Sequence, residues 1–279
     1  MIRSWLMDEL MDELMAVEMT DLVVTAVGPI RLIELNRPDQ LNSMSEELHS
    51  ALASLWDSLA ADPEARVVVL TGRGRAFSAG GDFDIMTRVQ HDRAFRERNV
   101  DEARRIITGM VRCPLPVIAA VNGPAVGLGC SLALLSDLVL IADDAHLADP
   151  HVQVGLVAGD GGALVLPLLV GLTRAKELLF LGDRVSAEEA VRLGIANLAV
   201  PKDKLLDEAM DLAGRLAALP AQALRETKRA VNLHLEQALA TVLEPALLAE
   251  QETMHSPDHI AVVEKIIASR ARRRTGGDG

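Results

Sequence analysis

Short runs of consecutive apolar residues alternate along this chain with segments whose apolar residues recur at helical spacing. The runs at 67–70, 116–121 and 137–142 are each bounded by polar or turn residues, and runs of this length are typical of strands buried on both faces. The segment 22–35 predicts two more strands around the turn at Gly28-Pro29. Strands of this kind, joined by helices, favour an α/β fold built from repeated turns of the chain.

Helix signals fill the gaps between the strands. Ser43-x-x-Glu46 is a capping-box pattern, followed by leucines at 48, 52, 55 and 59 on one helical face. Ser186-x-x-Glu189 predicts a second capped helix that stops at Gly194. From Lys202 onward the pattern is wholly helical, with Pro220 between two helices. We therefore divide the chain into a loose N-terminal extension (1–18), an α/β core (19–200) and a C-terminal helical region (201–279).

Two of the predicted strands end in glycine-rich turns that precede helices. The first turn contains Ala79-Gly80-Gly81, and the second contains Gly127 and Gly129. Around the second turn Val126, Cys130, Ala133 and Leu134 recur at helical spacing. Backbone N–H groups at such a turn point at whatever lies above the strand, and they favour negative charge. Two turns side by side in one sheet could direct amides at one point, so an anion or a developing oxyanion is the expected guest.

Composition narrows the function classes. The chain of 279 residues carries a formal net charge of −12, and its aromatic content is 2% with no Tyr, which argues against nucleic acid as the partner because that requires basic patches and stacking platforms. No apolar run reaches the roughly 18 residues of a membrane helix, and we expect no membrane partner. The two cysteines, Cys113 and Cys130, fit buried free thiols in a reducing cytoplasm. We see no metal-ligand motif.

The motifs AFSAGGDF, IAAVNGPAVGLGCSLALLSD and LGDRVSAEEAVRLGIAN, in this order, together resemble those of the crotonase superfamily, the enoyl-CoA hydratase/isomerase group. The resemblance covers about residues 20–265 and implies a spiral of repeated ββα units followed by a helical oligomerisation region. It also implies a cytoplasmic lyase or isomerase of fatty-acid metabolism that assembles as a homotrimer or a dimer of trimers. The substrate would be an acyl-CoA thioester, with coenzyme A as part of the substrate rather than a separate cofactor.

The resemblance assigns roles to several positions. The backbone N–H groups of Gly81 and Leu128 would form the oxyanion hole for the thioester carbonyl. The CoA contacts would come from residues of the first turn and of a preceding loop, namely Gln40, Leu41, Ala79 and Gly80. Asp39 stands where the family often has a basic residue near CoA, which leaves Arg37, Arg73 or Arg75 as candidate phosphate partners. Asp82 is interpreted as structural, holding a short helix start.

The chain departs from the family at the residues that carry the chemistry. Hydratases of this family use two glutamates as general base and general acid. The position of the first is occupied by Ser131, and the position of the second by His151. The two-glutamate mechanism is therefore in doubt. Ser131 is interpreted as a helix residue rather than a catalyst, and Leu128 replaces a small residue, which could narrow the pocket.

A different catalytic pair is proposed from the segment that begins at His151. Histidine can act as a general base near neutral pH, and a carboxylate on its other ring nitrogen would fix the tautomer. Asp160 is the candidate for that carboxylate, with Gly155 and Gly159 between them to permit a turn. The pair resembles that of the oxocamphor hydrolase branch, and Glu252 is a weaker match to a further acidic residue there. The competing interpretations are a structural histidine and a helix N-cap at Asp160.

Three functions follow from these residues. The first is an enoyl-CoA hydratase/isomerase-like enzyme that works through an enolate held by Gly81 and Leu128, with His151 and Asp160 in place of the usual glutamates. The second is hydrolysis of a C–C bond in a β-dicarbonyl substrate. The third is a non-catalytic protein of the same fold that binds acyl-CoA. The charged segment 93–105 is interpreted either as a lid near the acyl pocket or as a solvated helix face.

Overall fold

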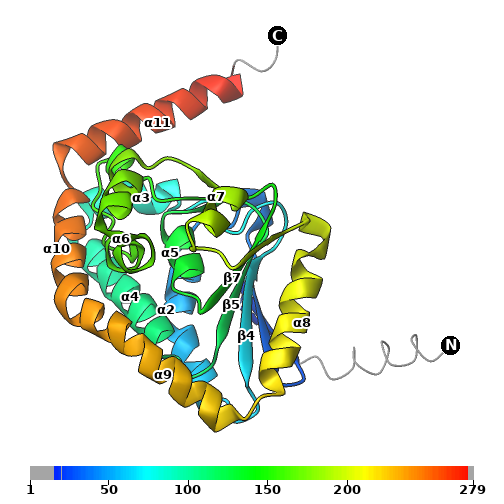
Figure 1. Ribbon diagram of the computed structural model, residues 1–279. Coiled ribbons are helices and arrows are strands. Elements are labelled where there is room, and N and C mark those ends of the chain that lie inside the picture. Colours follow the sequence, from blue (N-terminus) through cyan, green and yellow to red (C-terminus); the bar gives the residue numbers. More distant parts are fainter. Residues whose placement is uncertain (1–15, 20, 276–279) are drawn as a thin grey trace.

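A seven-stranded sheet forms the centre of the molecule (Figure 1). The computed structural model describes residues 16–19 and 21–275. In spatial order the sheet contains β1 (Ala16–Met19), β2 (Leu22–Val27), β3 (Ile30–Leu35), β4 (Val67–Gly72), β5 (Val117–Val121), β7 (Leu138–Ala142) and β10 (Leu198–Val200). The strands from β3 to β10 are parallel, while β1 and β2 add an antiparallel edge. The predicted α/β class is confirmed.

The central strands are apolar because both faces of the sheet are covered. Every residue of β4 and β5 is buried, as expected for parallel strands with helices on either side. Helix α8 (Leu205–Ala217) lies on one face, and α2 (Glu46–Ala61), α4 (Arg93–Arg112) and α5 (Leu128–Leu134) lie on the other side (Figure 1). Because β4 and β5 are parallel, their carboxyl ends lie at the same edge of the sheet, and the glycine turns follow at that edge.

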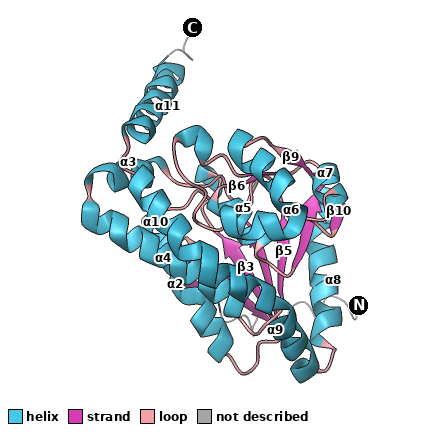
Figure 2. Ribbon diagram, turned by 60° about the vertical axis from the view of Figure 1, so that its left-hand side comes forward, coloured by secondary structure: helices cyan, strands magenta, loops and turns pink. Residues whose placement is uncertain are grey.

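The remaining elements pack around this central sheet and its helices. A small sheet is formed by β6 (Ala125–Val126), β8 (His146–Ala148) and β9 (Val185–Ser186). The other helices are α3 (Phe83–His91), α6 (Gly162–Leu181), α7 (Ala187–Arg192), α9 (Ala221–Ala238) and α10 (Glu244–Thr253), with 3-10 turns η1 (Pro38–Gln40), η2 (Val152–Val154) and η3 (Lys202–Lys204) and the π-helical turn η4 (Leu239–Leu243). Helix α11 (Pro257–Thr275) projects away from the body (Figures 1 and 2).

Several local predictions are confirmed and two are wrong. The hydroxyl of Ser186 accepts from the N–H of Glu189, as predicted. Helix α2, however, is capped by Ser45, whose Oγ accepts from Leu48 N at 3.1 Å, because the chain before it makes a bridge to the first glycine turn. The sheet also begins at Ala16, so the predicted boundary at residue 18 falls inside β1. The rest of the predicted extension, residues 1–15, lies outside the described residues.

Candidate active site

Hydrogen bonds join the two glycine turns into one unit. The N–H groups of Phe77 and Ser78 donate to Pro124 O at 3.1 and 3.0 Å, and Val126 N donates to Ser78 O at 2.9 Å. A Cβ on Gly129 would lie 2.7 Å from the side chain of Ser78, so only glycine permits this approach. The two turns therefore lie side by side, as predicted.

The amides of Gly81 and Leu128 are left free by this arrangement. In the bridge between Met44 and Gly81, Gly80 O accepts a hydrogen bond from Met44 N, and Asp82 N donates one to Met44 O. The N–H of Gly81 takes no part in this bridge and faces away from it. Leu128 is the first residue of α5, where helix N–H groups have no partner within the helix. No hydrogen bond from either N–H to a described residue is present. Both residues line one cavity of about 740 Å³.

His151 lies in the same cavity wall, between β8 and η2. Its Nδ1 is 2.5 Å from Oδ1 of Asp149, and its Nε2 is 3.3 Å from Oδ2 of Asp160. The predicted pair of His151 and Asp160 does meet, with Gly155 in the left-handed conformation (φ 74°) that the turn between them requires. The carboxylate on the other ring nitrogen is Asp149, however, which sequence reasoning passed over although it is only two residues away.

Asp160 is held at the cavity by a residue from α5. The hydroxyl of Ser131 donates to Oδ1 of Asp160 at 3.4 Å, and both side chains are buried. Helix α6 is capped by Gly161 with no side-chain hydrogen bond, so the N-cap interpretation of Asp160 is wrong. The carboxylate of Asp160 thus lies next to Ser131, the position at which relatives of the hydratase type would carry their first glutamate.

A third carboxyl group completes the cluster. Glu250 of α10 is 5% exposed and lines the cavity, and one ligand-type atom from each of His151, Asp160 and Glu250 lies within 4.8 Å of the others. The predicted match at Glu252 is wrong, since that side chain is 80% exposed and lies 3.9 Å from His255. Glu252 lies on the outer side of the same helix. A helical count from the buried Leu247 would have favoured 250 over 252.

Burial and mutual charge set the protonation of the cluster. Burial alone would lower the pKa of His151, but the charges of Asp160 and Asp149 outweigh it and hold that pKa well above the ordinary value. Burial, followed by the nearby charge of Asp160, raises the pKa of Glu250 well above its ordinary value. Burial would raise the pKa of Asp149, yet His151 keeps it lowered. Both shifts favour the forms of His151 and Glu250 that carry the proton.

That protonation state also bears on metal binding. His151, Asp160 and Glu250 are the set of described residues whose atoms are close enough to hold a metal ion, although the sequence shows no ligand motif. A histidine nitrogen binds metal only without its proton, and the raised pKa of His151 opposes its loss. The arrangement suits proton transfer better than metal binding.

The residues predicted to contact CoA line the same cavity. Gln40, Leu41, Ala79 and Gly80 all contribute to its wall. Of the candidate phosphate partners, only Arg75 lines the cavity, whereas Arg73 pairs with Glu34 at 2.9 Å.

Arg37 has a structural role at the same edge. It lies 2.9 Å from Asp82, which caps α3 by accepting from Asp84 N. The structural interpretation of Asp82 is confirmed. Arg75 remains the arginine placed to meet an anionic group at the cavity mouth.

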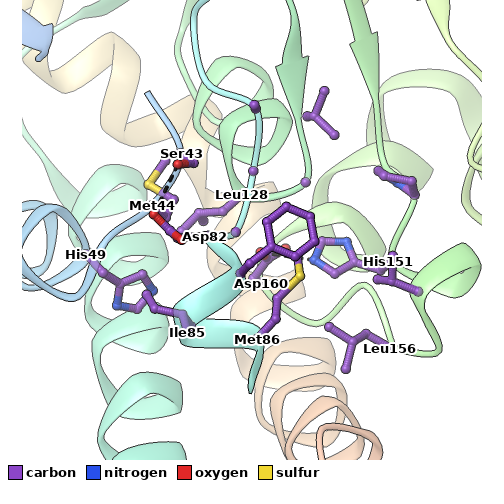
Figure 3. Close-up of a pocket in the computed structure, with 18 of the residues that line it drawn as sticks. Ser43, Met44, His49, Asp82, Ile85, Met86, Leu128, His151, Leu156 and Asp160 are labelled. Carbon is purple, nitrogen blue, oxygen red and sulfur yellow. Dashed lines mark hydrogen bonds and ion pairs between the residues drawn. The ribbon is translucent and has the colours of Figure 1, made fainter. Parts of the chain in front are cut away.

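The remaining predictions concern Leu128, the charged segment 93–105 and the two cysteines. Leu128 is 6% exposed and faces the cavity, where its side chain takes up space as predicted (Figure 3). The charged segment 93–105 lies in α4. The inner face of this helix is buried at Phe95, Val100 and Ala103, and its Asn99 lines the cavity. Both interpretations of that segment therefore hold in part. Cys113 and Cys130 are buried free thiols, and burial raises the pKa of each.

A parallel core sheet, paired glycine turns with free amides and a buried cluster of acid–base side chains surround one cavity, an arrangement typical of an α/β enzyme. The family model "Enoyl-CoA hydratase/isomerase" matches residues 26–268. The chain belongs to this family, within the crotonase superfamily. None of the helices in residues 16–19 and 21–275 is long and apolar enough to cross a membrane.

Individual relatives agree with this assignment. A putative enoyl-CoA hydratase of Thermus thermophilus is 42% identical over 205 residues, covering 72% of this chain and 79% of that protein. The 1,2-epoxyphenylacetyl-CoA isomerase of Escherichia coli is 32% identical over 261 residues, covering 88% and 95%. A crystal structure of an enoyl-CoA hydratase/isomerase from Mycobacterium paratuberculosis has a TM-score of 0.86 at 51% identity, covering 88% of this chain and 98% of that one. The chain is an enzyme of the enoyl-CoA hydratase/isomerase type that acts on acyl-CoA.

Proposed function

We propose that this enzyme transfers protons on an enolate intermediate of an acyl-CoA thioester, with Asp160 as the base and Glu250 as the acid. The single observation that carries the proposal is that Asp160 and Glu250 lie together in the wall of a cavity that the free amides of Gly81 and Leu128 also line. Burial raises the pKa of Glu250 and so favours its proton-carrying form, which suits the acid of such a pair.

The oxyanion hole supplies the largest single contribution. The thioester oxygen accepts from the N–H groups of Gly81 and Leu128, and negative charge grows on that oxygen as the enolate forms. Fixed backbone donors stabilise this charge without reorganisation, and loss of one such donor costs about two to three orders of magnitude in rate. The support is that both amides lack a described partner and that hydrogen bonds between their loops hold them beside one cavity.

His151 has a different role from the one that its sequence position suggests. A histidine that already holds its proton cannot start the reaction as a base, and the raised pKa of His151 gives it that proton. Its Nε2 instead faces Asp160 at 3.3 Å and orients that carboxylate, while Asp149 holds the opposite ring nitrogen. His151 and Asp149 are thus positioning residues, and Asp160 faces the substrate.

Two reactions use this machinery. In isomerisation, Asp160 takes a proton from the carbon between the thioester and a 3,4-double bond, the electron pair moves to the thioester oxygen, and a proton returns at the far carbon as the double bond shifts. In hydration, Asp160 takes a proton from water as its oxygen adds to the β-carbon, and Glu250 gives its proton to the α-carbon. Both reactions are of the kinds named in the description of the matched family, enoyl-CoA hydratase/isomerase.

The other two functions predicted from sequence remain outcomes of a test. C–C hydrolysis of a β-dicarbonyl would use the same oxyanion hole, with Asp160 activating water against one carbonyl. A non-catalytic acyl-CoA binder would show affinity without turnover. The buried charged cluster favours an enzyme over a binder, because charges without a chemical task are costly to bury.

The deciding experiment screens the purified protein against 2-enoyl-CoA, 3-enoyl-CoA and cyclic β-diketone substrates. We expect turnover of an enoyl-CoA that falls by at least about a hundredfold in Asp160→Asn. Asp143→Asn, a change at an exposed carboxylate beside β7, is the matched control and should leave turnover unchanged. Binding of a saturated acyl-CoA without turnover of any substrate would instead support the binder. Ring opening of the diketone alone would support the hydrolase.

We also propose a homotrimer or a dimer of trimers. The α6 segment carries Leu168 before its kink at Gly171 and Leu172 and Phe180 after it, at 50%, 67% and 64% exposure. Exposed apolar groups of this kind favour association with another copy. Sedimentation equilibrium measures the assembly, and Leu172→Glu is expected to dissociate it. A monomer in the unchanged protein would contradict this proposal.

A further inference from the structure

A second histidine–carboxylate pair lies at the far end of the same cavity. His49 of α2 and Glu102 of α4 face each other, with Nδ1 of His49 2.9 Å from Oε2 of Glu102. Their side chains are 5% and 11% exposed, and His49 lines the cavity. Figure 3 shows His49 and His151 on opposite sides of this pocket. The pair takes no part in the proton transfers proposed above.

The ring of His49 is held so that one nitrogen remains available. Nδ1 is engaged by Glu102, and no described residue hydrogen-bonds Nε2. Asn99 also lines this end of the cavity and lies one helical turn before Glu102 on α4. A buried histidine–carboxylate pair is weak evidence for stability, because apolar residues of similar volume would often serve packing as well or better. Because His49 lines the cavity, its Nε2 can meet a ligand there.

The wall between the two polar ends is apolar. Ile85, Met86 and Val89 of α3 line the cavity, and Ile85 and Met86 lie between His49 and His151 in Figure 3. A ligand that fills the cavity consequently meets polar groups at the thioester, apolar side chains along its middle and polar groups again at its end. An unsubstituted alkyl chain would leave Nε2 of His49 without a hydrogen-bond partner, which is costly in a buried site.

We infer that the acyl group of the substrate carries a hydroxyl at its distal end, bound by His49 and Asn99; this inference rests on the acyl-CoA function proposed above. A hydroxyl is the group that suits this site whichever way the ring is protonated. It donates to Nε2 of a neutral ring and accepts from Nε2–H of a charged one, and the amide of Asn99 likewise offers both functions. A terminal carboxylate would instead approach the carboxylate of Glu102.

The test compares binding rather than turnover, so that it does not depend on which reaction is catalysed. Isothermal titration calorimetry measures the dissociation constants of saturated straight-chain acyl-CoA thioesters of graded length and of their ω-hydroxy counterparts. We expect the unchanged enzyme to bind the hydroxylated member about tenfold more tightly at the length that reaches His49. His49→Leu should reduce this advantage to about twofold or less, and His49→Gln should retain part of it.

Two further variants keep the result interpretable. Asn99→Leu changes a half-buried residue and should reduce the hydroxyl advantage about threefold even if His49→Leu fails to fold. His234→Gln, at an exposed position on α9, is the matched control and should leave the advantage unchanged. Equal affinity for both series at every length, or an advantage that survives both His49→Leu and Asn99→Leu, would overturn the inference but leave the acyl-CoA function standing. Failure to bind any acyl-CoA would overturn both.

Discussion

The carboxylate of Asp149 lies 2.5 Å from Nδ1 of His151, on the side of the ring opposite Asp160. A Cβ on Gly162 would come within 1.9 Å of Oδ2 of Asp149, so the glycine at the start of α6 makes room for this contact. The imidazole is thus clamped between two carboxylates, and its proton is stabilised by both. The consequence is that the protonated form of the His151 imidazole is favoured next to Asp160, the proposed base.

Removal of the Asp149 charge should weaken this clamp. In Asp149→Asn the pKa of His151 is expected to fall, because one of the two carboxylates that raise it is gone. The imidazolium would then lose its proton at a lower pH, and the alkaline limb of the kcat profile should move to lower pH, with about a hundredfold lower kcat at its maximum. Steady-state kinetics across pH measures this. An unchanged profile would show that Asp149 has no part in catalysis.

Proline tests the amide of Leu128 without changing the cavity's polar side chains. Leu128→Pro deletes the N–H at the first position of α5, where proline is tolerated because that N–H has no partner within the helix. We expect kcat to fall by about two to three orders of magnitude, with a melting temperature close to that of Leu128→Ala, which loses the same buried side chain. Leu128→Ala keeps the amide and controls for the lost side chain. Comparable kcat values in the two variants would remove Leu128 from the oxyanion hole.

Glu250 should make stability depend on pH in a defined direction. Its raised pKa means that the folded state holds this proton more tightly than the unfolded state, so its stabilising contribution is full below the unfolded pKa and is lost as pH rises through the folded pKa. In that interval the free energy of unfolding should fall by about 1.4 kcal/mol per pH unit for this one proton. Urea unfolding at several pH values measures it, and Glu250→Gln should remove that share of the slope. Glu252→Gln, at an exposed site, should not.

Close packing of α2 on α4 can be tested at a glycine. A Cβ on Gly109 would lie 2.8 Å from Cβ of Trp56, a fully buried side chain, so Gly109→Ala should destabilise the fold by about 1–3 kcal/mol. Gly214→Ala in α8 meets nothing within 4 Å and should be neutral or stabilising by up to about 1 kcal/mol. Thermal and urea unfolding compare the two. If both variants were equally stable, the helix contact would be looser than described.

Apolar runs and glycine turns were enough to predict the sheet and the two loops that carry Gly81 and Leu128. Strands buried on both faces require runs of apolar residues, and tight turns require glycine, so both features appear as sequence patterns. Asp149 and Glu250 belong to no such pattern. Asp149 is close to His151 in the chain, but its orientation depends on α6 packing beside it. Glu250 reaches the cluster from α10, ninety residues after Asp160, and only the folded chain brings them together. The pKa shift of His151 could not be predicted from the sequence either, because it depends on the charges of both Asp149 and Asp160 in the folded chain.

The contact between Ser131 and Asp160 joins helix α5 to the loop before α6. Helix α5 contains no acidic side chain, yet the carboxyl group of Asp160 lies beside it, provided by that loop. The place of a reactive group in the cavity therefore need not be set by the element that lines the cavity there, because a neighbouring segment of the chain can supply it.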